Sequence, residues 1–112
     1  MKYALLIYVK PGSHEALSED EYQSVNREYF AVRDEDGVID GAHLQPDHTA
    51  TTLRMQDGET LTTDGPFADT REVIGGYYIV EADNLDRALE LAARIPAIRL
   101  GGAVEVRPLV EY

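Results

Sequence analysis

The chain has 112 residues, no cysteine, and 21 acidic against 10 basic side chains, which gives a formal net charge of -11. This length indicates one domain over residues 1–112 with a core that needs no disulfides. The lack of cysteine excludes a disulfide framework, a thiol nucleophile and a cysteine metal site. The strong negative field disfavours nucleic acid, so we expect no direct nucleic-acid partner.

The N-terminal segment 3–9 is apolar on both of its alternating sets of side chains, which predicts a strand covered on both faces. Pro11-Gly12 ends it. The segment is too short to span a membrane, and no small-residue cleavage site follows it. We therefore expect a cytoplasmic protein without a membrane partner.

A helix is predicted from Ser18, which forms a capping-box pattern with Glu21, to Gly37, which stops it. Its apolar residues recur at helical spacing: Tyr22, Val25, Tyr29 and Val32.

Three strands are predicted next. Residues 38–44 form a short one that is limited by Pro46. Segments 49–55 and 59–63 flank Gln56-Asp57-Gly58, a hairpin signal whose turn needs positive φ angles. We expect this hairpin to be half exposed.

The segment 76–81 is again apolar on both sets and predicts a central strand. Asp83 is expected to cap a second helix, which Pro96 stops, and residues 103–108 form the last strand. The expected buried stripe of that helix is Leu85, Ala88, Leu89, Ala92 and Ile95.

The resulting order predicts an α+β fold: a ferredoxin-like sandwich with an extra β-hairpin. Two helices can cover only one face of such a sheet. Because the first and central strands are apolar on both sides, the second face needs a cover, and a second copy of the chain is the simplest source. We expect a homodimer whose sheets face each other.

Several motifs together resemble the DGPF branch of the YCII-related family, and the resemblance spans nearly the whole chain. The segment 63–72 (TDGPFADTRE) leads directly to a Gly75-Gly76-Tyr77-Tyr78 element. The other matching pieces are the opening 1–8, Leu44-Gln45-Pro46, 86–90 and 104–108.

This resemblance implies a dimeric α+β barrel of ferredoxin-like subunits, similar in architecture to muconolactone isomerase and small monooxygenases. A His-Asp pair is proposed as catalytic in the family, with the histidine on the first helix. In this chain the equivalent position falls near Asn26, which cannot act as a general base. The resemblance also suggests a link to sigma factors.

Asp64 is the first catalytic candidate, since it stands on a Gly-Pro turn where a dry cleft would raise its pKa and suit it to proton transfer. The alternative is that its carboxylate caps the turn.

His43 is the second catalytic candidate, because a histidine near Asp64 could share a proton with it at neutral pH. The alternative is a solvent-facing or packed role, and His14, in the loop after the first strand, is a weaker candidate. The spacing of His43, Asp47 and His48 matches no compact metal motif, so we expect no metal site.

Four residues are candidates for ligand binding. Arg54 and Arg71 could hold a carboxylate, or could pair with neighbouring acids. Phe67 and Tyr77 could supply an aromatic wall, or could belong to the core or the dimer interface.

The sequence favours a small dimeric protein that binds a small molecule, or acts on it by proton transfer, in a cleft near Asp64. Whether it is catalytic stays open. The alternative function is a non-catalytic partner domain linked to sigma-factor-dependent transcription. Gly75-Gly76 precedes a strand and therefore makes no phosphate loop, and we expect no cofactor.

Overall fold

The computed structural model describes residues 1–67 and 70–112. Its elements follow the predicted order. They are β1 (Lys2–Val9), α1 (Glu19–Arg33), β2 (Val38–His43), the 3₁₀ helix η1 (Asp47–Thr49), β3 (Thr51–Gln56), β4 (Glu59–Asp64), β5 (Val73–Glu81), α2 (Leu85–Ala92), the 3₁₀ helix η2 (Pro96–Ile98) and β6 (Ala103–Pro108).

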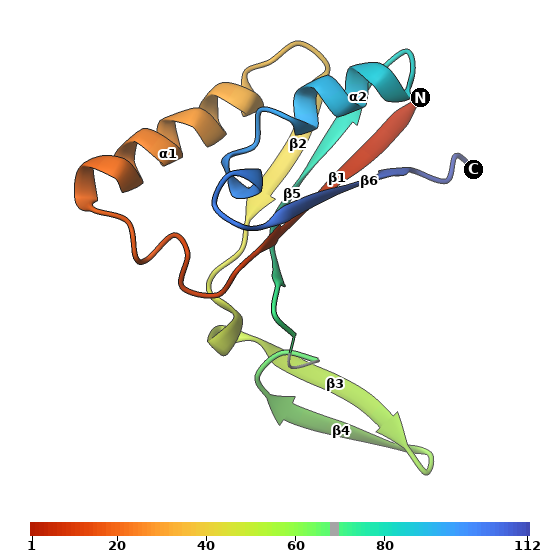
Figure 1. Cartoon of the computed structure of the whole chain (residues 1–112). Helices are drawn as coiled ribbons and strands as arrows, with labels where there is room; N and C mark the ends of the chain where they lie inside the picture. Colours follow the sequence, from red (N-terminus) through yellow and green to blue (C-terminus); the bar gives the residue numbers. More distant parts are fainter. Residues whose placement is uncertain (68–69) are drawn as a thin grey trace.

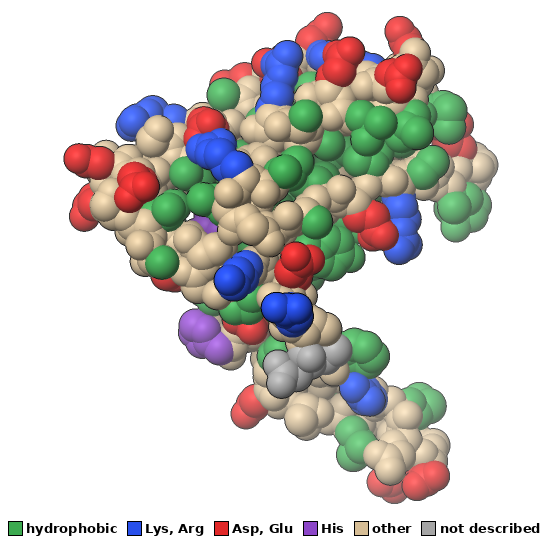
Figure 2. Space-filling model, in the orientation of Figure 1, with side chains coloured by type: hydrophobic (Ala, Val, Ile, Leu, Met, Phe, Trp, Pro, Cys, Tyr) green, Lys and Arg blue, Asp and Glu red, His purple; other side chains and the backbone are tan. Residues whose placement is uncertain are grey.

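Four strands form one antiparallel sheet in the order β2-β5-β1-β6, while β3 and β4 pair only with each other. With the hairpin set aside, this is the ferredoxin-like arrangement, and the predicted α+β class with an extra hairpin is confirmed. Both helices lie on one side of the sheet, and the hairpin leaves it on the other side (Figure 1). The space-filling view shows a wide notch between the hairpin and the body of the molecule (Figure 2).

The core lies between the helices and the sheet. Leu5 of β1 is 0% exposed, and the buried side chains around it come from β1, both helices, β5 and the segment after α2. They include Ile7, Val32, Tyr78, Val80, Leu91 and Ile95. Burial of such side chains is the main source of stability for this part of the chain.

Helix α1 begins as predicted. The Ser18 side chain accepts a hydrogen bond from the Glu21 backbone N–H, and the Glu21 carboxylate accepts one from the Ser18 N–H. Val25 and Val32 are buried, which confirms that part of the predicted stripe. Tyr22 is exposed instead, so the apolar face is narrower than expected.

Helix α2 differs from the prediction in its cap and in its rotation. Its N-cap is Asn84, not Asp83, because the Asn84 side chain accepts the hydrogen bond from the Arg87 backbone N–H. Leu85 and Leu89 are about half exposed, whereas Leu91 is 0% exposed. The predicted burial is confirmed for Ala88, Ala92 and Ile95, and the small side chains of Ala88 and Ala92 fit either rotation.

The hairpin turn has the predicted geometry, with φ angles of 51° at Asp57 and 80° at Gly58. The expectation of half exposure was wrong. Every residue of β3 and β4 except Thr52 is exposed, and the side chains of Leu53 and Met55 are 67% and 74% exposed. We call residues 51–64 the arm.

The sheet face opposite the helices carries an apolar row. Ala42, Tyr77 and Leu6 are neighbours across β2, β5 and β1, and Tyr77 and Leu6 are partly buried. None of the described helices is both long enough and apolar enough to cross a membrane.

Candidate functional site

A cavity of about 390 Å³ lies between α1, the loop before it, and one end of the sheet. Its wall is mostly apolar and aromatic, with a few polar groups, as in typical small-molecule sites. Helix α1 contributes Asn26 and Tyr29, and the segment after β2, residues 44–47, closes the rim.

Glycines in β5 make the floor of this cavity. A Cβ atom on Gly76 would lie 2.7 Å from the carbonyl oxygen of Ala42, so β2 and β5 can approach each other only because this residue is glycine. Gly75 is the extra residue at an irregularity in the register of β1 and β5, where Ile7 faces Gly76 and Tyr8 faces Ile74. Such bulges bend a strand locally and redirect its side chains.

The loop between β1 and α1 folds back on itself and brings His14 to the cavity wall. The backbone N–H of Ser13 donates to the carbonyl of Lys10 at 3.0 Å, and that of Leu17 donates to the carbonyl of His14 at 3.2 Å. His14 is thereby held against α1, although no regular element contains it.

Side-chain hydrogen bonds connect this loop to α1. His14 Nδ1 lies 3.1 Å from Ser13 Oγ, and His14 Nε2 lies 2.9 Å from the hydroxyl of Tyr29. Tyr78 of β5 fixes the same turn of α1, because its hydroxyl donates to the Tyr29 backbone carbonyl at 2.7 Å.

His43 completes this wall from the sheet side. Its ring lies nearly parallel to that of Tyr29, with centroids 6.2 Å apart and planes 21° apart. The rings of His14 and Tyr29 have centroids 5.8 Å apart. Unlike His14, His43 is exposed, so its imidazole is accessible to a molecule in the cavity.

Burial shifts the titration of these groups. Burial lowers the pKa of His14, and the nearby His43 adds to this, while Glu15 opposes it. Burial also raises the pKa of Tyr29 and of Tyr78 to about 12 each. At neutral pH His14 is therefore a neutral imidazole beside a protonated phenol.

Asp64 and His43, the two predicted catalytic residues, lie in different surroundings. His43 lines the cavity, whereas Asp64 is exposed at the end of β4, paired with Thr51, and lines neither of the two described cavities. The turn after Asp64 is held by Gly65, whose N–H donates to the Ala50 carbonyl at 2.7 Å and whose φ is 100°.

The predicted ligand-binding residues divide among three places. Arg54 stacks on Phe67 on the arm side, with its guanidinium carbon 4.5 Å from the ring centroid and its Nη2 donating to the Phe67 carbonyl at 3.1 Å. Arg71 lines a second, more polar hollow beside Tyr8. Tyr77 belongs to the open face of the sheet.

Sequence reasoning ranked His14 too low and did not connect it to Tyr29. No local signal joins them, because the contact depends on the fold of a loop. Asn26 also lies on the cavity wall. In the part of the chain that the structure describes, no three His, Asp or Glu side chains are grouped so as to hold a metal ion.

Comparison with solved structures supports the fold. The chain is similar to 5-chloro-2-hydroxyhydroquinone dehydrochlorinase (TftG) from Burkholderia phenoliruptrix AC1100, in a complex with 2,5-dihydroxybenzoquinone. The TM-score is 0.54 at 18% identity, over 100% of this chain and 96% of the other. At that identity the likeness concerns the fold alone.

Comparison with sequences supports a family. The chain is 39% identical over 117 residues to the uncharacterized protein R00369 of Rhizobium meliloti (strain 1021), covering 100% of this chain and 94% of that protein. The model of the YCII-related domain matches residues 1–112. The chain therefore belongs to the YCII-related family.

Proposed function

We propose that this protein binds a small planar molecule in the cavity beside α1 and transfers a proton to or from it through His43. The observation that carries the proposal is the accessible imidazole of His43, packed on Tyr29 in a mostly apolar cavity of about 390 Å³. A neutral imidazole has one nitrogen that can accept a proton and one that can donate a proton, as general acid–base catalysis requires. Tyr22 and Phe30, which are exposed and line the cavity, offer aromatic surface for a flat ring.

The structural neighbour suggests a probe for this site. That protein is in a complex with 2,5-dihydroxybenzoquinone, a flat ring with acidic hydroxyl groups. A ring of that size fits within a cavity of about 390 Å³. We propose the same chemical class, small planar hydroxylated rings, for this chain.

Calorimetric titration with 2,5-dihydroxybenzoquinone tests the proposal. We expect His43→Ala to weaken binding about tenfold or more, since one strong contact is worth about 1.4 kcal/mol or more. Repeating the titration in buffers of different ionisation enthalpy should show that the mutation removes proton exchange on binding.

His48→Ala is the matched control for this titration. His48 is also exposed and lies only five positions away, but it does not line the cavity. Equal affinities for the wild type, His43→Ala and His48→Ala would contradict the proposed role of His43.

We further propose that the chain belongs to the DGPF branch and works as a homodimer through the open face of its sheet. Support comes from the segment Asp64-Gly65-Pro66-Phe67 and from the apolar row of Leu6 and Tyr77. A stable monomer in light scattering at micromolar concentration would contradict the dimer. Leu6→Asp, which places a charge in that row, should produce monomers.

Asp64 stays in this proposal as a second acid-base group. It lies at the root of the arm, where it is paired with Thr51. Thr51 follows shortly after Asp47, the η1 residue that lines the cavity rim. Arg54 and Phe67 lie on the arm side and Arg71 lines the second hollow, so these three residues would contact only a ligand that extends beyond the cavity. Asp64→Asn should lower the rate of proton transfer without abolishing ligand binding, and an unchanged rate would remove Asp64 from the site.

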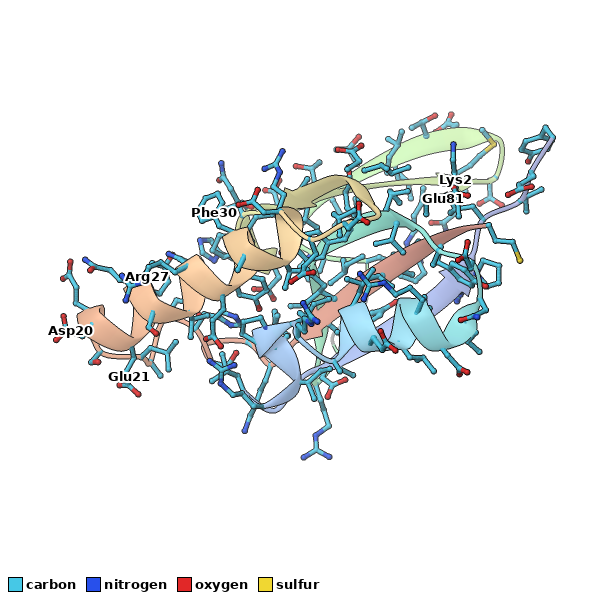
Figure 3. All side chains as sticks on the ribbon, turned by 90° about the horizontal axis from the view of Figure 1, so that it is seen from above. Lys2, Asp20, Glu21, Arg27, Phe30 and Glu81 are labelled. Carbon is cyan, nitrogen blue, oxygen red and sulfur yellow. The ribbon has the colours of Figure 1, made fainter. Side chains whose placement is uncertain are left out.

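The alternative proposal, a non-catalytic domain that binds a sigma factor, is favoured only by the net charge of -11. Viewed from above, Asp20 and Glu21 project from the free end of α1 (Figure 3). Reversing the charges of Glu19 and Asp20 should abolish capture of sigma factors if this alternative holds, while His43→Ala should not. If sigma factors were still captured by the charge-reversed variant but not by His43→Ala, the alternative function would be excluded.

A further inference from the structure

The contacts behind Tyr29 form a continuous chain that the proposed role of His43 does not use. Starting at the cavity, the Tyr29 hydroxyl contacts His14 Nε2 at 2.9 Å, and His14 Nδ1 contacts Ser13 Oγ at 3.1 Å. Tyr29 and His14 line the cavity, and Ser13 lies in the surface loop between β1 and α1. The chain therefore runs from the cavity wall to the surface.

We propose that Ser13, His14 and Tyr29 form a proton relay that exchanges protons between a molecule in the cavity and solvent. This inference rests on the proposed function, since it assigns the route by which the site is reset after each transfer. It also specifies the ligand class: a compound with a weakly acidic hydroxyl group that can reach the Tyr29 oxygen.

Each proton that enters the relay has a donor and an acceptor. The ligand hydroxyl gives its proton to Tyr29 Oη while the Tyr29 O–H proton passes to His14 Nε2. The His14 Nδ1–H proton then passes by way of Ser13 Oγ to solvent, which leaves the hydrogen of His14 on Nε2. Once the ligand has left, Nδ1 takes a proton from solvent through Ser13, and Nε2 releases its proton through Tyr29 to water in the open cavity. These two steps restore the starting tautomer. One O–H bond of the ligand is broken, one proton is released, and no redox partner is needed.

The direction of the hydrogen bonds follows from acidity. A phenol is a far stronger acid than the N–H of a neutral imidazole, so Tyr29 donates and His14 Nε2 accepts. His14 Nδ1 then carries the hydrogen and donates to Ser13 Oγ. The relay thus requires one defined tautomer of His14, with the proton on Nδ1.

The charged and titratable groups around the relay are compatible with this assignment. His14 faces Glu15 of its own loop, Tyr29 of α1 and His43 of β2, and its pKa is lowered chiefly by burial. Tyr29 faces Tyr78, Glu28 and Arg99, and burial raises its pKa to about 12. Both groups are thus neutral at pH 7, as a relay in the resting state requires.

The tautomer can be observed without any ligand. In the ¹⁵N-histidine NMR spectrum of the wild type at pH 7, we expect the two ring nitrogens of His14 to show a single tautomer with hydrogen on Nδ1. Tyr29→Phe keeps the ring but removes the donor, so the tautomer preference should be lost and the pKa of His14 should rise. Tyr22→Phe, which alters another cavity-lining tyrosine of α1, should change neither.

A mixture of tautomers in the wild type, hydrogen on Nε2, or a spectrum insensitive to Tyr29→Phe would overturn the relay. His14→Gln provides a second test if Tyr29→Phe fails to fold. With resorcinol as the probe, a planar ring whose hydroxyl groups keep their protons at pH 7, it should slow proton exchange at least tenfold while leaving the dissociation constant within twofold. Exchange at the wild-type rate would also overturn the relay.

The two proposals fail in different ways. Absence of binding to the wild type removes the proposed function but leaves the tautomer measurement intact. If His14→Gln binds the ligand and exchanges protons normally while His43→Ala loses both properties, only the relay is excluded. The proposed function is then retained.

Discussion

The body of the molecule and the arm are stabilised in different ways. In the body, side chains from β1, both helices and β5 are removed from water, and Leu5 is 0% exposed. In the arm, by contrast, all but one of the strand residues are exposed, and local pairing around the Asp57-Gly58 turn sets the structure. An isolated two-stranded hairpin is marginal in water. The contrast shows that the body can hold the side chains of a site in fixed positions. The conformation of the arm depends instead on its turn and on any molecule that it contacts.

The largest expected effect comes from removing core volume. Leu5→Ala should lower the free energy of unfolding by about 2–5 kcal/mol, since it leaves a cavity between β1 and the helices. Leu53→Ala is the matched change in the arm, where the side chain is 67% exposed, and should cost less than about 0.5 kcal/mol. Urea denaturation followed by circular dichroism measures both. Equal losses would show that the arm is packed as tightly as the body.

Alkaline pH should destabilise the body next. The pKa of Tyr29 and that of Tyr78 are raised from 10.0 to about 12, so the folded state keeps phenol protons that the unfolded state has lost. Between pH 10 and 12, stability should therefore fall as pH rises, by less than about 1.4 kcal/mol per pH unit for each ring because solvent reaches part of both rings. Tyr78→Phe should roughly halve this slope in urea titrations. An unchanged slope in Tyr78→Phe would show that other groups cause the loss of stability. The arm should not add to this loss, because residues 47–67 contain no tyrosine.

A smaller effect is expected at the arm turn. Gly58 has a φ of 80°, so Gly58→Ala should weaken the hairpin by about 1 kcal/mol. Amide hydrogen exchange should quicken in β3 and β4 only. Faster exchange in β1 or β5 would show that arm and body unfold as one unit.

The smallest expected effect concerns the stacking of Arg54 on Phe67. Arg54→Gln removes a cation above the ring and should cost about 0.5–1 kcal/mol at this exposed place. Chemical shifts of Phe67 should change, while those of the cavity residue His43 should not. Arg71→Gln, outside this contact, serves as the control, and an equal response of Phe67 to both changes would argue against a specific contact.

Elements coded by local chemistry were predictable from sequence. The capping box of Ser18 and Glu21 and the Asp57-Gly58 turn involve residues close in the chain, and both were confirmed. Helix α2 was predicted in the wrong rotation because two apolar stripes share Ala88 and Ala92. Only packing against β1 and β6 selects the stripe that contains Leu91.

The site was less predictable than the fold. His43 was a sequence candidate and does line the cavity, but the significance of His14 depends on turns in an irregular loop that carry no periodic pattern. The expected pairing of His43 with Asp64 assumed that the end of β2 and the turn after β4 lie close together. In the described chain His43 lines the cavity and Asp64 does not, since β3 and β4 pair with each other and not with the sheet.

The insertion of the arm between β2 and β5 also bears on how the chain folds. His43 and Gly76 are direct partners across these two strands, so their pairing must close a long stretch of chain, and closure entropy opposes it. The hairpin forms from neighbouring residues, on a timescale of about 1–10 μs, and brings Thr51 and Asp64 together. Its early formation would shorten the stretch that remains to be closed. The arm, although its strands pair only with each other in the native state, would then set how fast β2 and β5 pair to form the cavity floor.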